Sequence, residues 1–198
     1  VADQYSFAQR KTYAAEAQGW SDKNWAQLAE QGLLGLPFDE AHGGSGYGLV
    51  ELGVVLEEFG RACVPGPFLA TVAAAAVLAR SSSDHAPTLR ALAEGAPCAL
   101  APNGLGVDVL GARDDAPTLV LDDEGCALVP AGALAWVQGD ALDVVRGSVH
   151  AEQPAPGVPV AIDARRARDV VAVLAAAEAV GIAQWCVDTA AAYASDRV

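Results

Sequence analysis

The sequence predicts an α+β fold with an all-α N-terminal domain, an antiparallel β middle domain and the start of a C-terminal helical bundle. Three observations predict it. Apolar residues recur at helical spacing over residues 1–96, short β-prone runs alternate with turn signals over residues 97–163, and helical spacing returns over residues 164–198. We therefore expect three domains with these boundaries, the middle one short or incomplete and the last one truncated.

The N-terminal domain contains four segments with the marks of helices. Ser21 can cap the first, and Gly32 follows its end, where a left-handed residue is favoured. The second carries apolar residues at positions 49, 52, 56 and 59, which form one stripe of an amphipathic helix. Glycines at four of the six positions 43–48 predict a turn-rich loop between these two helices. The expected helices span residues 22–31, 49–61, 68–80 and 87–94.

The middle domain has short β-prone runs separated by turn sequences such as Asp-Asp-Glu-Gly and Pro-Ala-Gly, which predict an antiparallel meander. A long helix should follow from residue 164, because Val170, Leu174 and Gly181 fall on one seam. Its most apolar window, residues 170–183, is interrupted by Glu178 and is shorter than a bilayer span, so we interpret it as a buried core helix. The expected strands span residues 118–121, 127–129, 135–137 and 144–149.

The composition excludes several classes of protein. With 12 Lys and Arg against 25 Asp and Glu, the formal charge is −13, which argues against a nucleic-acid partner and a basic membrane-surface helix. Hydrophobic residues make up 53% of the chain, too many for a disordered protein. Without a cationic, apolar signal peptide, we expect a cytoplasmic protein with no membrane partner. The sequence has no methionine and no cap at the end of its last helix. We therefore expect a fragment of a longer chain, or ordered pieces of such a chain joined into one sequence.

Local motifs predict no catalytic residue and no metal site. The four cysteines form no Cys-x-x-Cys pair, so free thiols in a reducing cytosol are expected. The run from His42 to Gly46 invites a hydrolase interpretation, but the sequence has neither a Gly-x-Ser-x-Gly elbow nor a phosphate-binding glycine loop. Adjacent acids such as Asp122 and Asp123 are expected at the surface, and neither His85 nor His150 has neighbours at metal-ligand spacing.

Two longer strings resemble the acyl-CoA dehydrogenase family. The first combines residues 25–37 with Glu40-Ala-His-Gly-Gly-Ser-Gly46 and Val54-Val-Leu-Glu-Glu-Phe-Gly-Arg61, and it resembles the family's N-terminal helical domain. The second combines residues 176–184 with Tyr193-Ala-Ser-Asp-Arg197, and it resembles the first helix of the family's C-terminal four-helix domain. The family's order of helical domain, β-barrel and helical bundle agrees with the order derived above.

The resemblance implies an FAD-dependent acyl-CoA dehydrogenase subunit that converts an acyl-CoA thioester to the 2,3-enoyl-CoA. In that chemistry a carboxylate removes the proton α to the thioester, and the β-hydrogen leaves as a hydride to the flavin. The implied partners are the acyl-CoA substrate, an electron-transfer flavoprotein, and related subunits in a homo- or hetero-oligomer. The glycine loop 43–46 and the helix 49–61 would shape the acyl pocket.

Arg197 is the one residue to which the resemblance gives a cofactor role. It matches the arginine of the family's Tyr-x-x-x-Arg segment, which contacts the FAD pyrophosphate of a neighbouring subunit. A planar guanidinium suits that contact because it can bind phosphate oxygens in pairs.

The departures from the family pattern leave two hypotheses open. The family's catalytic glutamate lies either beyond residue 198 or at the position that Val171 occupies here, and Glu178 does not match, so no catalytic residue is assigned. The family's Thr/Ser-rich strand, which contacts the flavin, and its Gly-Ser-Asp loop are not found in this sequence. Residues 103–109 occupy some of the positions where they are expected. The chain is either part of an active flavoenzyme or a non-catalytic structural partner subunit of a heteromeric acyl-CoA dehydrogenase.

Overall fold

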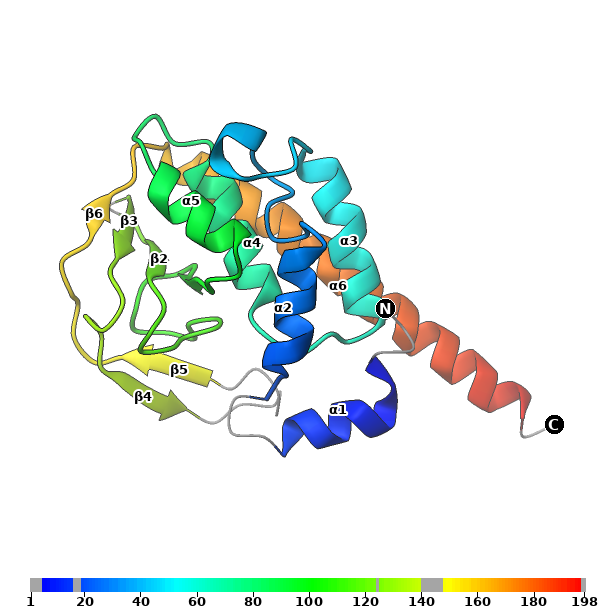
Figure 1. The fold of residues 1–198 in the computed structure, drawn as a ribbon. Helices are drawn as coiled ribbons and strands as arrows, with labels where there is room; N and C mark the ends of the chain where they lie inside the picture. The colour runs from blue at the N-terminus through cyan, green and yellow to red at the C-terminus, as the bar shows by residue number, and fades with distance from the viewer. Residues whose placement is uncertain (1–4, 16–18, 124, 140–147, 197–198) are drawn as a thin grey trace.

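A computed structural model describes residues 5–15, 19–123, 125–139 and 148–196 (Figure 1). Helices come first, then strands, then one long helix, which confirms the predicted α+β class. The helices are α1 (Phe7–Ala14), α2 (Asp22–Glu30), the 3₁₀ helix η2 (Glu40–His42), α3 (Leu49–Arg61), α4 (Phe68–Leu78), α5 (Ala86–Ala93) and α6 (Ala164–Ser195). The strands are β1 (Ala99–Ala101), β2 (Thr118–Leu121), β3 (Cys126–Val129), β4 (Trp136–Gly139), β5 (Ser148–Ala151) and β6 (Val158–Pro159).

The sheet is mixed, where the sequence predicted an antiparallel meander. Four strands lie in the order β1-β2-β3-β6, and β4 pairs separately with β5. β1 runs parallel to β2, whereas the other pairs are antiparallel. Parallel neighbours need a long connection, and residues 102–117 supply it. Most of the strand expected at residues 144–149 lies outside the described residues.

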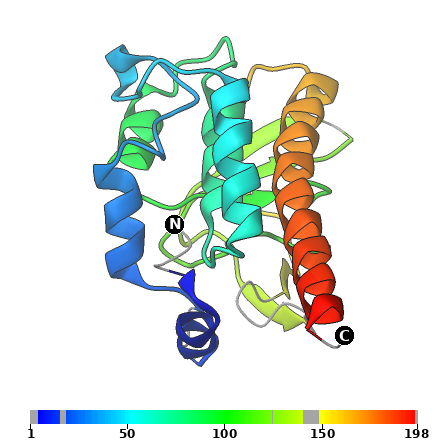
Figure 2. The same cartoon turned by 90° about the vertical axis from the view of Figure 1, so that its right-hand side faces the viewer.

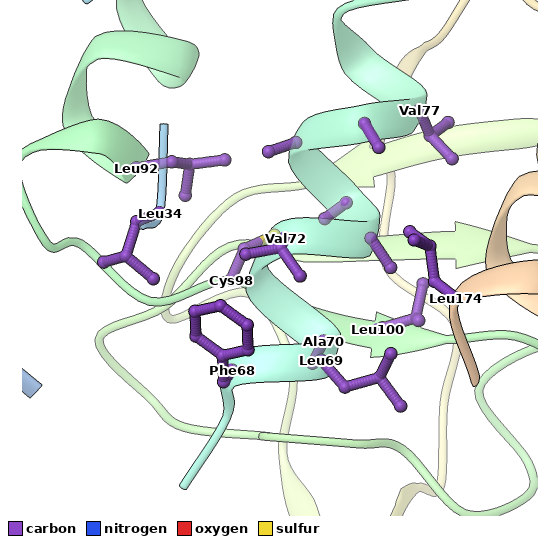
Figure 3. Close-up of a cluster of buried hydrophobic side chains, with 14 of the residues drawn as sticks. Leu34, Phe68, Leu69, Ala70, Val72, Val77, Leu92, Cys98, Leu100 and Leu174 are labelled. Carbon is purple, nitrogen blue, oxygen red and sulfur yellow. The ribbon is translucent and has the colours of Figure 1, made fainter. Parts of the chain in front are cut away.

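Helix α4 forms the centre of the molecule. Every residue from Phe68 to Leu78 is buried, as expected for a helix that is apolar on all sides. Figure 3 shows its side chains between Leu34 and Leu92 on one side and Leu100 and Leu174 on the other. One hydrophobic cluster therefore joins the N-terminal helices, the sheet and the first half of α6.

Helices α3 and α6 lie side by side on one face of the molecule (Figures 1 and 2). Two glycines permit their close contact. A Cβ at Gly60 would lie 2.0 Å from the carbonyl oxygen of Glu178, and a Cβ at Gly181 would lie 1.8 Å from that of Glu57. Backbones that approach this closely leave no room for a larger residue at either position.

Helix α6 is only half covered by the rest of the chain. Over residues 170–183 the buried positions are Val170, Val171, Leu174, Glu178 and Gly181, so the expectation of a buried core helix holds for one face alone. Residues 182–195 are all exposed, and Figure 1 shows this half extending beyond the body. Within the described residues, α6 is also the one helix long and apolar enough to cross a membrane, with 28% of its most apolar window buried.

Candidate functional site

The glycine loop forms one wall of a cleft of about 410 Å³ at the C-terminal end of α4. The opposite wall is the loop between α4 and α5, and the floor is apolar, with Phe38, Leu78 and Leu89. This is the size range of small-molecule sites. The cleft is lined by residues 37–39, 42, 46, 47, 78–81, 83–85 and 89.

Close packing fixes the shape of the glycine loop. A Cβ at Gly44 would lie 2.1 Å from the carbonyl oxygen of Phe38, so only glycine fits there. Gly43 and Gly46 have φ angles of 82° and 70°, which favour glycine. The Ser45 hydroxyl donates to the carbonyl oxygen of Gly32 at 3.3 Å. This hydrogen bond helps to hold the loop in place.

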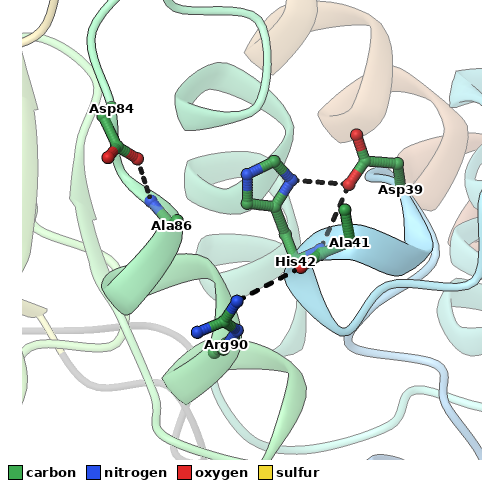
Figure 4. A network of polar contacts seen from close by, with 6 residues as sticks. All are labelled: Asp39, Ala41, His42, Asp84, Ala86 and Arg90. Carbon is green, nitrogen blue, oxygen red and sulfur yellow. Dashed lines mark hydrogen bonds and ion pairs between the residues drawn. The ribbon is translucent and has the colours of Figure 1, made fainter.

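The glycine-loop wall carries a histidine paired with a carboxylate (Figure 4). The Nδ1 atom of His42 lies 2.5 Å from Oδ1 of Asp39, and both groups are partly exposed. Arg90 on α5 braces the same wall by donating to the carbonyl oxygen of Ala41 at 3.4 Å. Across the cleft, Asp84 accepts a hydrogen bond from the backbone N–H of Ala86 at 2.9 Å. The walls of the cleft are therefore charged, whereas its floor is apolar.

A second histidine lies on the opposite wall. His85 is 8% exposed, and its Nε2 atom lies 3.0 Å from the hydroxyl of Ser83. Burial lowers the pKa of His85, and the nearby Asp84 carboxylate partly offsets this effect. No sequence pattern predicted this cleft, because its two walls are about forty residues apart and share no motif.

Metal and thiol chemistry find no support in the described part of the chain. No group of three or more His, Cys, Asp or Glu residues there could hold a metal ion. The four cysteines are all free. Burial raises the pKa of Cys98 to about 12 and that of Cys126 to about 11, so both thiols are protonated and poorly nucleophilic at neutral pH.

Helix α4 lines no open space over its central turns. Residues 72–77 are 0% exposed, so no water-sized space touches them. Leu52 and Leu56 on α3 are equally inaccessible. The glycine loop thus lines a cleft, whereas the buried faces of α3 and α4 leave no open space. The other face of α3 is exposed to solvent and carries Val50 and Val54.

The position of the expected base is also filled by an apolar side chain. Val171 is buried in the main hydrophobic cluster. Glu178, seven residues later, is buried where α6 crosses α3, and its backbone touches Gly60. Neither residue is assigned a catalytic role.

The segment that follows β1 offers no hydroxyl group to a flavin. Residues 99–112 contain no serine or threonine. The backbone N–H groups of Gly104 and Val109 donate within the protein, to the carbonyl oxygens of Leu121 and Val149. Val107 is 47% exposed and offers only an apolar surface. These residues supply few donors for FAD, and Arg197 lies outside the described residues.

Comparisons with known proteins agree on one family. The family model for the acyl-CoA dehydrogenase N-terminal domain matches residues 4–92. Two relatives named Acyl-CoA dehydrogenase IpdE2 match, one from Mycobacterium tuberculosis, 29% identical over 93% of this chain, and one from Mycolicibacterium smegmatis, 31% identical over 91%. These matches cover 57% and 56% of the relatives, so the chain spans about half their length.

Solved structures share the fold. The structure titled "Tcur3481-Tcur3483 steroid ACAD G363A variant" matches with a TM-score of 0.75 and 24% identity, over 96% of this chain and 62% of that one. "PigA with FAD and proline" matches with a TM-score of 0.68 and 15% identity, over 100% and 66% of the two chains. Residues 4–92 therefore match the N-terminal domain of the acyl-CoA dehydrogenase family, and the chain as a whole resembles proteins of that name in sequence and shares the fold of these solved structures.

Proposed function

We propose that the chain is a subunit of an FAD-dependent acyl-CoA dehydrogenase that converts an acyl-CoA thioester to the 2,3-enoyl-CoA. The observation that carries the proposal is the order of structural regions along the chain, which matches that of the family: helices, then a small sheet, then a long helix. These regions are built around the buried helix α4 and the contact between α3 and α6. The β-hydrogen would leave as a hydride, for which bound FAD would supply the acceptor. An electron-transfer flavoprotein as electron acceptor and a cytoplasmic location belong to the same proposal.

A second candidate is a non-catalytic structural partner in a heteromeric dehydrogenase. Three observations favour it. Val171 is apolar and buried at the position where the family resemblance implies the base of some members, Leu52 and Leu56 on the helix expected to shape the acyl pocket are fully buried, and residues 99–112 offer no hydroxyl to a flavin. The double name of the Tcur3481-Tcur3483 structure is consistent with related dehydrogenases made of two components. In this role the chain would complete the fold of an assembly whose flavin and base lie on another subunit.

Purification with and without its neighbours separates the two candidates. The chain is produced alone and together with the products of adjacent genes, and each preparation is assayed for flavin absorbance and for acyl-CoA oxidation with an artificial electron acceptor. Stoichiometric flavin and oxidation by the chain alone would establish the first candidate and eliminate the second. Flavin and activity found only in the two-component complex would establish the partner role. A complex without flavin or oxidation would refute both.

A further inference from the structure

The turn that carries His42 holds its imidazole ring in one orientation. One carboxylate oxygen of Asp39 lies 2.5 Å from Nδ1 of His42 and also accepts a hydrogen bond from the backbone N–H of His42 at 3.2 Å. The turn is closed by Gly44, whose backbone N–H donates to the carbonyl oxygen of Asp39 at 2.9 Å. The same turn therefore fixes both the carboxylate and the ring that it contacts.

The Asp39 carboxylate also determines which ring nitrogen of His42 carries the hydrogen. An ionised carboxylate can only accept hydrogen bonds, so Nδ1 has to be the donor. In the neutral ring, Nε2 then has a lone pair and acts as an acceptor. No hydrogen bond to Nε2 of His42 is found among the residues that the structure describes. Figure 4 shows this nitrogen directed away from Asp39, toward the wall of the cleft that carries Asp84.

The remainder of the cleft suits a neutral molecule with an apolar body. Its floor is apolar, so it can bury hydrocarbon. Its walls carry charges of both signs, because carboxylates at Asp39 and Asp84 face the same space as the guanidinium of Arg80. Arg80 donates to the carbonyl oxygen of Ala76 at 2.9 Å, which holds it at the end of its own helix. An ion of either sign would meet a like charge in this cleft, whereas an uncharged polar group would not.

We propose that this cleft binds a small alcohol with an apolar body, whose hydroxyl donates a hydrogen bond to Nε2 of His42. A carboxylate and a histidine arranged in this way accept a hydrogen bond from a serine hydroxyl in serine hydrolases. Here no described serine lies within hydrogen-bond distance of the ring of His42, so the ligand supplies the hydroxyl. The body of the alcohol lies against Phe38, Leu78 and Leu89.

Two probe molecules, benzyl alcohol and benzyl methyl ether, test the proposal on the intact chain. They share the apolar ring, but only the alcohol can donate a hydrogen bond. Each is titrated at about pH 8, where imidazole side chains are ordinarily neutral, and binding is followed by the NMR signals of the methyl groups of Leu78 and Leu89 in the floor. Benzyl alcohol should bind about fivefold more tightly, because the ether leaves Nε2 of His42 without a donor. Equal affinities would overturn the proposal.

A substitution at His42 shows whether this side chain is the source of the preference. His42→Phe keeps a ring at this exposed turn but removes the acceptor, so it should bind the alcohol and the ether equally. His150→Phe is the matched control, since His150 lies outside the cleft, and it should keep the preference. A preference that survives in His42→Phe would overturn the assignment of the hydroxyl to Nε2.

Nitrogen NMR of the unchanged chain provides a second test that needs no variant. The hydrogen should be found on Nδ1 of His42, and the Nε2 signal should shift when benzyl alcohol is added but not when the ether is added. A hydrogen on Nε2 in the neutral ring would refute the proposal. Benzoate serves as an anionic probe of the same size. If it bound more tightly than benzyl alcohol, the cleft would be a site for anions and the proposed class of ligand would be wrong.

Discussion

At the scale of single residues, the clearest constraint is the glycine pair between α3 and α6. Replacing Gly181 by alanine puts a Cβ 1.8 Å from the carbonyl oxygen of Glu57 and 2.7 Å from the backbone nitrogen of Arg61. Backbone atoms cannot move aside as a flexible side chain can. We expect a loss of about 2 to 3 kcal/mol in the free energy of unfolding, even after the helix preference of alanine contributes about 1 kcal/mol.

Urea unfolding of Gly181→Ala and of a matched control checks this value. Gly106→Ala adds the same methyl group where no other heavy atom lies within 4 Å. Its free energy of unfolding should stay within about 0.5 kcal/mol of the unchanged chain. Equal stability of the two variants would mean that α3 and α6 do not make this close contact.

Arg197 carries the other prediction at this scale, and it rests on the family resemblance alone. Removing its guanidinium should lower the flavin retained by the assembled enzyme after gel filtration, since a paired phosphate contact is lost. The fold should be little affected. Arg165→Ala, at an exposed arginine on the first turn of α6, is the control and should retain flavin. Flavin content that Arg197→Ala leaves unchanged would remove the assigned role.

At the scale of elements, α6 depends on a side-chain cap at its start. Asp163 accepts a hydrogen bond from the backbone N–H of Arg166 at 2.9 Å. Asp163→Ala should lower the free energy of unfolding by about 1 kcal/mol, because an N–H of the first turn loses its acceptor. Asp163→Asn keeps a capping oxygen and should recover most of the loss in a thermal or urea unfolding experiment. If both variants lose the same stability, the charge of Asp163 matters and its capping bond does not.

Elements with strong local signals could be predicted from the sequence. Helix α3 has the expected bounds, and the other expected helices of the N-terminal region agree within two residues, because caps, glycines and prolines mark their ends. Helix α1 was not predicted, since its apolar spacing is weak. Its one local signal is the capping box between Ser6 and Gln9. The parallel pairing of β1 and the cleft could not be predicted, because both depend on contacts between segments distant in the sequence.

At the scale of the whole molecule, the uneven coverage of α6 stands out. Its first half is part of the main hydrophobic cluster. Its second half is held by a few side chains, such as Arg61, which lies 3.7 Å from Asp188, and Arg10, which lies 5.5 Å from the Trp185 ring. Apolar side chains on an exposed helix are in unfavourable contact with water. Packing of this helix against another surface would bury them and would be favourable.

The exposed valines of α6 should make the chain associate with itself when it is studied alone. Val173, Val180 and Val187 are 57%, 55% and 63% exposed and recur every seven residues, which puts them along one side of the helix. The double variant Val180→Glu/Val187→Glu should shift sedimentation equilibrium toward monomer at concentrations where the unchanged chain forms larger species. Because glutamate is a good helix former, helix content should be retained. Val107→Glu, which places a charge at a valine exposed outside α6, should associate like the unchanged chain. An identical distribution of species in the double variant would show that this side of α6 is not what holds copies together.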